Sequence, residues 1–416
     1  MTPVSRYVYR GGMPSPCQLQ KPYVIAVTGV AGSGKSTLGR ALAERLGAAL
    51  LDLDSVTNPL LDALPADAPG GHWLSSVHAA DIRRGRYAAL RAVASDQIAT
   101  TGAAVLVAPF TAELAGGEEW DLLCAAVAPA PIQVIHVAGD AALIAGRRAR
   151  RGEARDAHRS DDPLEPPRVP VLEIDAELST AQQLDRLLPA LGCRSALDPG
   201  APIFERRFDA VLFDLDGTLV DSTASVIRSW RRFAEHYEVS AEALHANHGQ
   251  TARTLIGLLL PQHLHDEGLA HVTDLEVTDA VGLGEVRGAH RFFHDVPREL
   301  RAVVTSGSVP IATARLTAAG FEHPEVFVTA DDVTRGKPDP EPFLTAAARL
   351  GVDPARCLVV EDAPAGIAAA RAAGCTVLAI AGTVAAEALH ADLVVDGLDR
   401  VSLAAEDDGL RLVPAA

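Results

Sequence analysis

Short apolar runs and amphipathic stretches alternate through the first half of the chain. An apolar run begins at Tyr23 and leads into a glycine-rich loop. After the loop, Leu38, Leu42 and Leu46 share one helical face, and Gly47 is a suitable end for that helix. Further apolar runs have the length of buried strands and lie at 49–54, 103–110 and 132–139. Strands of this kind, separated by helices, predict a parallel sheet that is covered on both faces.

The same alternation starts again with "FDAVLFDLDGTLVDS" at residue 208 and predicts a second α/β unit. Its other apolar runs lie at 302–308, 325–332 and 357–366. Between the first two runs lies a polar, helix-rich insert at about 222–288. In this insert four apolar side chains recur at helical spacing, and we expect them to pack internally. They are Val226, Trp230, Phe233 and Tyr237.

A chain of 416 residues is long enough for two or three compact units. The patterns predict two Rossmann-like α/β units with parallel sheets, the second carrying a helical cap as an insert. Residues 1–20 show no periodicity and are expected to form a flexible leader. The other predicted boundaries are 21–192 for the first unit, 193–207 for a linker and 208–416 for the second unit.

Composition narrows the class of protein. The hydrophobic fraction is 48% and the formal net charge is −17, values that describe a globular chain and disfavour binding to nucleic acid or an anionic membrane. No apolar run approaches the roughly 18 to 20 residues that span a bilayer, and no signal-peptide core is evident. The 5 scattered cysteines indicate reduced thiols. We therefore expect a cytoplasmic protein without membrane or nucleic-acid partners; the sequence leaves its oligomeric state open.

Lysine is rare in this chain. Among 37 basic residues only Lys21, Lys35 and Lys337 are lysines, and the others are arginines. An ammonium group is a compact charge that the wide guanidinium fork does not replace. Lys35 and Lys337 each lie in a motif suited to phosphate, which supports a role for both.

The loop after the first strand, "GVAGSGKST", is a candidate site for the phosphates of ATP or GTP. Its glycines allow successive N–H groups to converge on a phosphate, and the following helix adds positive potential at its N-terminus. We expect Lys35 to neutralise the β- and γ-phosphates and the Ser36 hydroxyl to bind Mg²⁺. The residues expected to bind the nucleotide are Gly29, Gly32, Ser33, Gly34, Lys35, Ser36 and Thr37.

Two further features favour a kinase. Asp52 and Asp54 end the second strand on the same side. Asp54 is the expected catalytic carboxylate, which accepts a proton from a substrate hydroxyl or orients Mg²⁺, and Asp52 is an expected substrate contact; helix capping is the alternative. The segment 146–159 holds six arginines against two acids. We expect it to form a lid that clamps ATP through Arg147 and Arg151, with a solvated helix face as the alternative.

From about residue 22 to 190 the chain resembles the small-molecule kinases among the P-loop proteins, namely the gluconate and shikimate kinases and their AAA-like relatives. The resemblance rests on "GVAGSGKST", on "DLD" and on the arginine-rich segment. It implies ATP-dependent phosphorylation of a small hydroxylated metabolite. The apolar run at 103–110 ends in Pro and Phe, so it lacks the acidic strand end that would help to hold the metal.

Asp214 and Asp216 follow the first strand of the second unit, and their spacing can direct both into one cleft. One carboxylate can attack phosphorus and form an aspartyl phosphate. The other can protonate the leaving oxygen and then deprotonate the hydrolytic water. Because an anion attacks an anion here, Mg²⁺ must be held by these carboxylates and a later one. Glu361 and Asp362, at another strand end, supply it.

Two other motifs suit the phosphoryl oxygens. The Ser306 hydroxyl in "VTSGS" lies near backbone N–H groups, and Gly307 is counted with it as a substrate contact. Lys337 in "RGKPDP" is expected to stabilise the charge that accumulates on the nucleophile and the phosphate.

In this order, "DLDGTLVDS", "VTSGS", "GKPDPEPF" and "VVEDAPAGIAAARAAG" resemble the four motifs of the haloacid dehalogenase superfamily over about 207–390. The resemblance implies that Asp214 is the nucleophile and Asp216 the general acid/base. It also implies phosphate binding by Ser306 and Lys337. The implied Mg²⁺ ligands are Asp214, the backbone carbonyl of Asp216 and Asp362, with Glu361 alongside. The second aspartate favours phosphate chemistry over halide chemistry.

The insert resembles the helical cap of members that act on small phosphomonoesters, and the motifs look closest to the sugar- and polyol-phosphate phosphatases, such as glycerol-3-phosphatase and 2-deoxyglucose-6-phosphatase. In the cap, "NHGQTARTL" at 247–255 lies where such enzymes contact substrate. His248, Gln250 and Arg253 are therefore candidate substrate contacts, with ordinary helix-surface roles as the alternative.

The sequence as a whole predicts a bifunctional enzyme with Mg²⁺ and ATP as cofactors. The second unit would hydrolyse a small sugar or polyol phosphate, and the first would phosphorylate a small hydroxylated acceptor. Three alternatives stay open: a polynucleotide kinase/phosphatase, a phosphatase with a nucleotide-sensing module that transfers no phosphate, and a phosphomutase.

Overall fold

The computed structural model describes residues 19–64, 73–74, 76–152, 165–240 and 251–415. The chain divides into two compact units. The first contains the chain up to Ala176 together with Leu187–Arg194, and the second contains Glu177–Arg186 and Ser195–Ala416.

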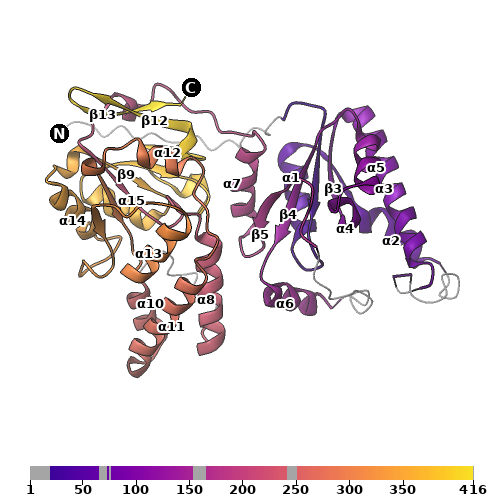
Figure 1. Ribbon diagram of the computed structural model, residues 1–416, viewed down its shortest axis with the longest axis horizontal. Coiled ribbons are helices and arrows are strands. Elements are labelled where there is room, and N and C mark those ends of the chain that lie inside the picture. Colours follow the sequence, from indigo (N-terminus) through magenta and orange to yellow (C-terminus); the bar gives the residue numbers. More distant parts are fainter. Residues whose placement is uncertain (1–18, 65–72, 75, 153–164, 241–250, 416) are drawn as a thin grey trace. The chain divides into compact units, whose positions relative to one another are not determined.

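The first unit is built on a sheet of five parallel strands in the order β2-β3-β1-β4-β5 (Figure 1). The strands are β1 Tyr23–Thr28, β2 Ala49–Asp52, β3 Ala103–Val107, β4 Ile132–Ala138 and β5 Leu172–Asp175. The helices that connect them are α1 Lys35–Leu46, α2 Leu53–Asp62, α3 Ala79–Thr101, α4 Thr111–Leu114, α5 Glu118–Val127 and α6 Ala141–Arg151. Every residue of β1 and β3 is buried, as central strands of a parallel sheet require.

The second unit contains a sheet of six parallel strands in the order β11-β10-β9-β6-β7-β8. These are β6 Ala210–Phe213, β7 Arg301–Val304, β8 Val326–Val328, β9 Cys357–Glu361, β10 Thr376–Ile380 and β11 Leu393–Val395. The helices of its core are α12 Ala289–His294, α13 Val309–Ala318, α14 Glu341–Leu350 and α15 Pro364–Ala372. An antiparallel hairpin, β12 Val401–Glu406 and β13 Gly409–Pro414, follows the sheet. Short 3₁₀ turns lie at Pro202–Glu205, Gln262–Leu264, Arg298–Leu300, Pro354–Arg356, Ala386–Ala388 and Leu398–Arg400.

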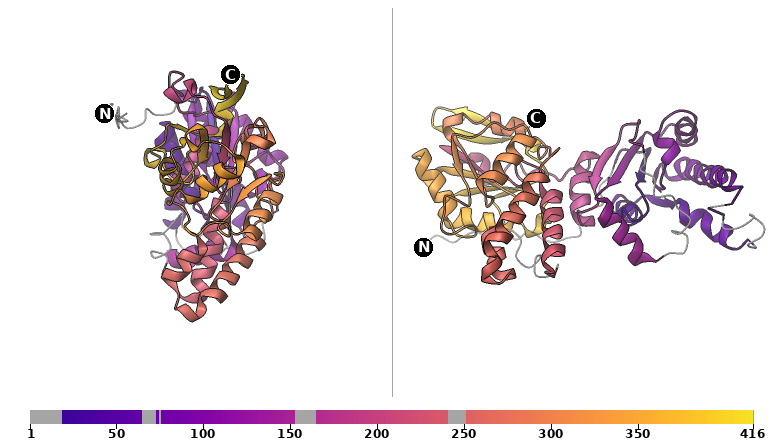
Figure 2. Two further views of the ribbon diagram at one scale, coloured as in Figure 1. Left: turned by 90° about the vertical axis from the view of Figure 1, so that its left-hand side faces the viewer. Right: turned by 60° about the horizontal axis from the view of Figure 1, so that its bottom comes forward.

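The insert forms a small helical domain of its own. Its helices α8 Thr223–Tyr237, α10 Ala252–Leu259 and α11 His265–Thr278 project together from one end of the α/β core (Figure 2). Phe233 is fully buried among Ile256, Leu260 and Val272. The ring of Trp230 lies edge-on to that of Phe233 at 5.2 Å between centroids. The aromatic stripe therefore packs inside the cap, as the helical spacing predicted.

The structure confirms the two parallel-sheet α/β units and differs from the sequence interpretation in detail. The hairpin after residue 400 was not predicted, because its strands are only partly buried and contain no continuous apolar run. Residues 177–186, predicted to belong to the first unit, group with the second unit. They include the first part of α7 Thr180–Ala190, while the rest of α7 belongs to the first unit.

The cysteines differ in state. Cys193 is disulfide-bonded, so the expectation of reduced thiols is wrong at this position. Cys124, Cys357 and Cys375 are free.

Among the described residues, none of the helices combines the length and the apolar character needed to cross a bilayer.

Candidate active site

The carboxyl ends of the central strands of the second unit bring four charged side chains together. Asp214 directly follows β6, Glu361 ends β9 and Asp362 comes next. Lys337 reaches the same point from the loop between β8 and α14. All four side chains are buried. Parallel strands of an α/β sheet present their ligand sites at this edge, which is why residues almost 150 positions apart meet here.

The Lys337 ammonium is the hub of this cluster. Its Nζ donates to Asp214 Oδ1 at 2.5 Å, to Glu361 Oε1 at 2.8 Å and to the carbonyl oxygen of Val304 at 3.1 Å. An ammonium group has three protons to donate, and here each has an acceptor. Lys337 also lies 5.1 Å from the centroid of the Phe343 ring on α14. The ammonium is therefore held in one place against the nucleophile candidate.

Two carboxylate oxygens of the cluster lack protein partners. Asp214 Oδ2 and Asp362 Oδ2 are buried without a hydrogen bond in the described part of the chain. The ligand atoms of Asp214, Glu361 and Asp362 all lie within 4.8 Å of one another. Unpaired buried carboxylate oxygens are costly unless a cation or a hydrogen bond meets them, and Mg²⁺ prefers hard oxygen ligands. These residues fit a Mg²⁺ ion.

The electrostatics of the cluster match this arrangement. Burial raises the pKa of Asp214 to about 7; Lys337 lowers it, while Glu361 and Asp216 raise it further. Burial and the neighbouring carboxylates also raise the pKa of Asp362 well above its usual value. For Lys337, burial lowers the pKa, but the Asp214 and Glu361 carboxylates outweigh it and raise the pKa. The cluster concentrates negative charge that one lysine only partly offsets, as a site for a further cation would.

Glu361 has a structural role in this geometry. Its Oε1 accepts from Lys337, and its Oε2 accepts from the backbone N–H groups of Asp362 at 2.8 Å and Ala363 at 2.9 Å. A Cβ on Gly366 would collide with the Glu361 carboxylate, so only glycine allows α15 to approach it. With both oxygens occupied, Glu361 orients Lys337 and the Asp362 backbone, and its metal-ligand role stays a prediction.

Asp216 lies beside the cluster and is held by residues that the sequence did not single out. Its Oδ1 accepts from the Ser222 hydroxyl at 2.6 Å and pairs with Arg315 Nη1 at 2.7 Å. Arg315, on α13, is buried and also pairs through Nη2 with Glu276 of the cap helix α11 at 2.8 Å. The candidate general acid/base is thus linked to the cap through one guanidinium group. One feature of the sequence could have indicated this role. Arg315 lies on the buried face of α13 with Ile311 and Leu316, at a position where helical periodicity predicts an apolar side chain.

The remaining candidates of the second unit lie in different places. Ser306 and Gly307 follow β7 at the same sheet edge, where the Gly307 N–H donates to the Thr305 hydroxyl at 3.0 Å. Arg253 lies on α10 with its side chain exposed. His248 and Gln250 lie outside the described residues. Contact of these residues with a substrate therefore stays a prediction.

The first unit presents a phosphate-binding loop at the end of β1. Helix α1 begins at Lys35, immediately after Gly34, with Ser36 and Thr37 in its first turn. Gly29 has φ +147° and its Cβ would lie 2.7 Å from the carbonyl oxygen of Val137, so the loop needs a glycine there. The loop and the helix N-terminus provide the geometry that binds anionic phosphate.

The structure changes the interpretation of Asp52 and Asp54 and leaves that of the arginine-rich segment a prediction. Asp52 ends β2 and caps α2 by accepting from the Asp54 N–H at 2.9 Å. Asp54 lies in the first turn of α2 and not on the strand, so the expected strand alternation does not apply, and its carboxylate pairs with Arg86 at 2.6 Å. Arg147 and Arg151 lie on α6, and a Cβ on Gly34 would be 4.0 Å from Arg147 Nη1. Arg147 therefore lies near the loop, and the clamping role of both arginines stays a prediction.

A phosphate-binding loop at the end of β1 and a buried lysine–carboxylate cluster at the carboxyl ends of β6 and β9 are the two candidate sites of the chain. Residues 208–374 match the family model of the haloacid dehalogenase-like hydrolases, and residues 24–166 match that of an AAA domain. Through its C-terminal part the chain belongs to the haloacid dehalogenase-like hydrolases, as its motifs predicted.

The relatives of this part are phosphatases. Hexitol phosphatase A of Escherichia coli (strain K12) is 39% identical over 49% of this chain and 97% of its own length. Glycerol-1-phosphate phosphohydrolase 2 of Saccharomyces cerevisiae is 36% identical over 42% of this chain and 76% of its own length. Validoxylamine A 7'-phosphate phosphatase of Streptomyces hygroscopicus is 36% identical over 47% of this chain and 96% of its own length.

Proposed function

We propose that the second unit is a Mg²⁺-dependent phosphatase that hydrolyses a small sugar or polyol phosphate. One observation carries the proposal: Lys337 binds Oδ1 of the buried Asp214 carboxylate, while Oδ2 of Asp214 and Oδ2 of Asp362 are buried with no hydrogen-bond partner among the described residues. Such a site is prepared for a cation and a phosphoryl group. The relatives are named as phosphatases of hexitol, glycerol 1-phosphate and validoxylamine A 7'-phosphate, and these names support a small hydroxylated substrate.

In the proposed reaction an oxygen of Asp214 attacks phosphorus, and the bond from phosphorus to the ester oxygen breaks. Asp216 gives its proton to the departing alkoxide, so an alcohol leaves. Asp216 then takes a proton from water, which attacks the aspartyl phosphate and breaks the bond to Asp214. Inorganic phosphate is released and Asp214 is restored. Mg²⁺, held by Asp214 and Asp362, would neutralise the charge of the phosphoryl oxygens.

Release of inorganic phosphate from a panel of hexitol, sugar and glycerol phosphates tests this function. We expect hydrolysis with Mg²⁺ present and its loss on adding excess EDTA, because the unpaired carboxylates then repel the phosphate. Re-addition of Mg²⁺ is expected to restore activity. Hydrolysis that persists in EDTA would contradict the proposed metal site, and transfer of phosphate between sugar positions without release would favour a phosphomutase.

We further propose that the first unit is a kinase of a small hydroxylated metabolite. The phosphate-binding loop, the AAA-domain match over 24–166 and the position of Arg147 near Gly34 support ATP binding at this unit. A kinase and a phosphatase in one chain avoid futile ATP hydrolysis if they act on different positions or at successive steps. The alternative is a nucleotide-sensing module that transfers no phosphate.

The variant Asp214→Asn allows the kinase to be tested without removal of the product by the phosphatase. With labelled ATP and a panel of sugars, polyols and oligonucleotides, we expect a labelled small acceptor. Adding Lys35→Ala is expected to abolish labelling, because the ammonium that neutralises the β- and γ-phosphates is lost. ATP binding without any labelled product would support the sensing module, and labelled oligonucleotide would support polynucleotide repair.

A further inference from the structure

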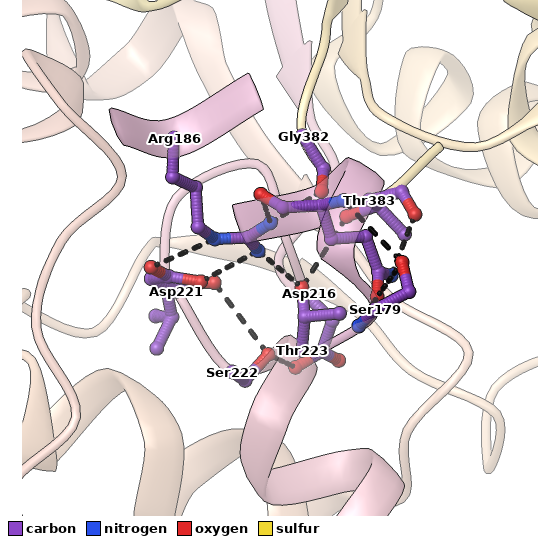
Figure 3. A network of polar contacts seen from close by, with 10 residues as sticks. Ser179, Arg186, Asp216, Asp221, Ser222, Thr223, Gly382 and Thr383 are labelled. Carbon is purple, nitrogen blue, oxygen red and sulfur yellow. Dashed lines mark hydrogen bonds and ion pairs between the residues drawn. The ribbon is translucent and has the colours of Figure 1, made fainter. Parts of the chain in front are cut away.

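Residues 177–186 belong to the second unit although they lie before the region that matches the hydrolase family, which starts at residue 208. One of these residues, Arg186, lies in the part of α7 that belongs to this unit and contacts other parts of the unit through its guanidinium group. Arg186 Nη2 pairs with Asp221 Oδ1 at 2.9 Å and donates to the Thr223 hydroxyl at 2.9 Å. Its Nε contacts Asp221 Oδ2 at 3.4 Å, and its Nη1 donates to the carbonyl oxygen of Gly382 (Figure 3). All three guanidinium nitrogens are thus engaged.

The partners of Arg186 lie on two loops of the phosphatase core. Asp221 and Thr223 flank Ser222 in the short link from the catalytic loop to the first cap helix, α8. Gly382 and Thr383 follow β10. Gln182 Nε2 donates to the Thr383 carbonyl oxygen at 2.8 Å, and the hydroxyls of Thr223 and Thr383 are 3.3 Å apart. Arg186 and Gln182 therefore join the two loops.

Ser222 connects this network to the reacting groups. Its hydroxyl donates to Asp216 Oδ1 at 2.6 Å, and its side chain is fully buried. Figure 3 shows Asp221, Ser222 and Thr223 in one network of polar contacts with Arg186 and Asp216. Because Arg186 contacts the residues on both sides of Ser222, it restricts the backbone that places the Ser222 hydroxyl on the general acid/base.

We infer that Arg186 is a positioning residue of the phosphatase, which acts through the link 221–223 to orient the Asp216 carboxylate. The inference rests on the proposed phosphatase function. It adds to the hydrolase a segment from outside the family's matched region. A surface ion pair by itself contributes little to stability, but a carboxylate that transfers a proton is sensitive to small displacements. Loss of Arg186 is therefore expected to slow the step in which Asp216 protonates the leaving group.

The test uses the full chain with Mg²⁺ and two esters that differ in leaving group. Glycerol 1-phosphate releases an alkoxide that needs a proton from Asp216, whereas p-nitrophenyl phosphate releases a stable phenolate that does not. We expect Arg186→Ala to lower kcat/KM for glycerol 1-phosphate by roughly tenfold to a hundredfold, since general acid catalysis is worth on the order of 10² to 10⁴. The loss on p-nitrophenyl phosphate is expected to be much smaller.

Two further variants separate this role from a structural one. Asp221→Ala is expected to reproduce the ester-dependent loss, and the double variant should be no worse than either single one, because both remove the same interaction. Arg356→Ala removes a comparable pair with Asp209 (2.5 Å), which lies at the amino ends of β9 and β6, away from the cluster. This variant should hydrolyse both esters at the wild-type rate. If Arg186→Ala lowers kcat/KM equally for both esters, or for neither, the inference about Arg186 is wrong while the proposed function stands. A wild-type chain that hydrolyses neither these two esters nor any hexitol or sugar phosphate of the panel would overturn the proposed function and the inference together.

Discussion

Replacing the proposed nucleophile, Asp214→Asn, is expected to abolish phosphate release, with kcat falling on the order of 10⁴-fold or more, as losing a covalent nucleophile does in other hydrolases. The amide has the shape of the carboxylate but no anionic oxygen to attack phosphorus. The fold should not suffer. Burial and nearby carboxylates raise the pKa of Asp214 to about 7, so a neutral side chain relieves an unfavourable charge. The measurements are phosphate release and thermal unfolding.

Asp209→Asn is the matched control for this variant. Asp209 directly precedes β6 and Asp214 directly follows it, so the two changes are chemically identical at opposite ends of one strand. Asp209 pairs with Arg356, far along the strand from the cluster. We expect full activity from Asp209→Asn. If Asp214→Asn retains more than a trace of hydrolysis while the control is normal, the covalent mechanism is wrong.

Replacing the buried lysine, Lys337→Met, is expected to cost both activity and stability. The methionine removes the charge that fixes Asp214, and losing such a preorganised group lowers kcat by about 10² to 10³. It also leaves Asp214 and Glu361 without their cation, and breaking a buried pair from one side costs about 3 to 5 kcal/mol of unfolding free energy. Urea unfolding and phosphate release measure the two effects.

Two variants sharpen the result at Lys337. Lys21→Met removes a lysine whose Nζ donates to the carbonyl oxygen of Thr101 at 2.8 Å in an exposed position, and little change is expected. Lys337→Arg keeps the charge but brings a wider group into a site where three acceptors lie within 3.1 Å of one nitrogen. We expect it to stay inactive. An active arginine variant would show that charge alone suffices and would contradict the compact-ammonium argument.

Much of the site could be predicted because the residues that form it lie in short sequence motifs. Asp214 and Asp216 are two residues apart, and Glu361 and Asp362 are adjacent, each pair at the end of an apolar run. The carboxyl ends of the strands in a parallel sheet lie at one edge, so the pattern predicted that these two pairs of acidic residues would lie close together. The scarcity of lysine also singled out Lys337 correctly as a member of the cluster.

Other parts of the site carried no readable signal. Asp54 was predicted on a strand because "ALLDLD" alternates, yet α2 begins at Leu53, since Asp52 caps it. Arg315 and Glu276 are far apart in sequence, and their pairing with Asp216 depends on how the cap lies on the core. Arg186 lies in a stretch that looked like the end of the first unit.

The sequence by itself determined the two α/β units, the phosphate-binding loop and the four haloacid dehalogenase motifs, because each depends on local periodicity or on a short run of neighbouring residues. Only the tertiary structure decided which oxygens of the carboxylates stay unpaired, how Asp216 is held and where residues 177–186 belong. Those properties depend on contacts between segments distant in the chain, and the pairing of a buried charge is set by the groups that packing brings against it.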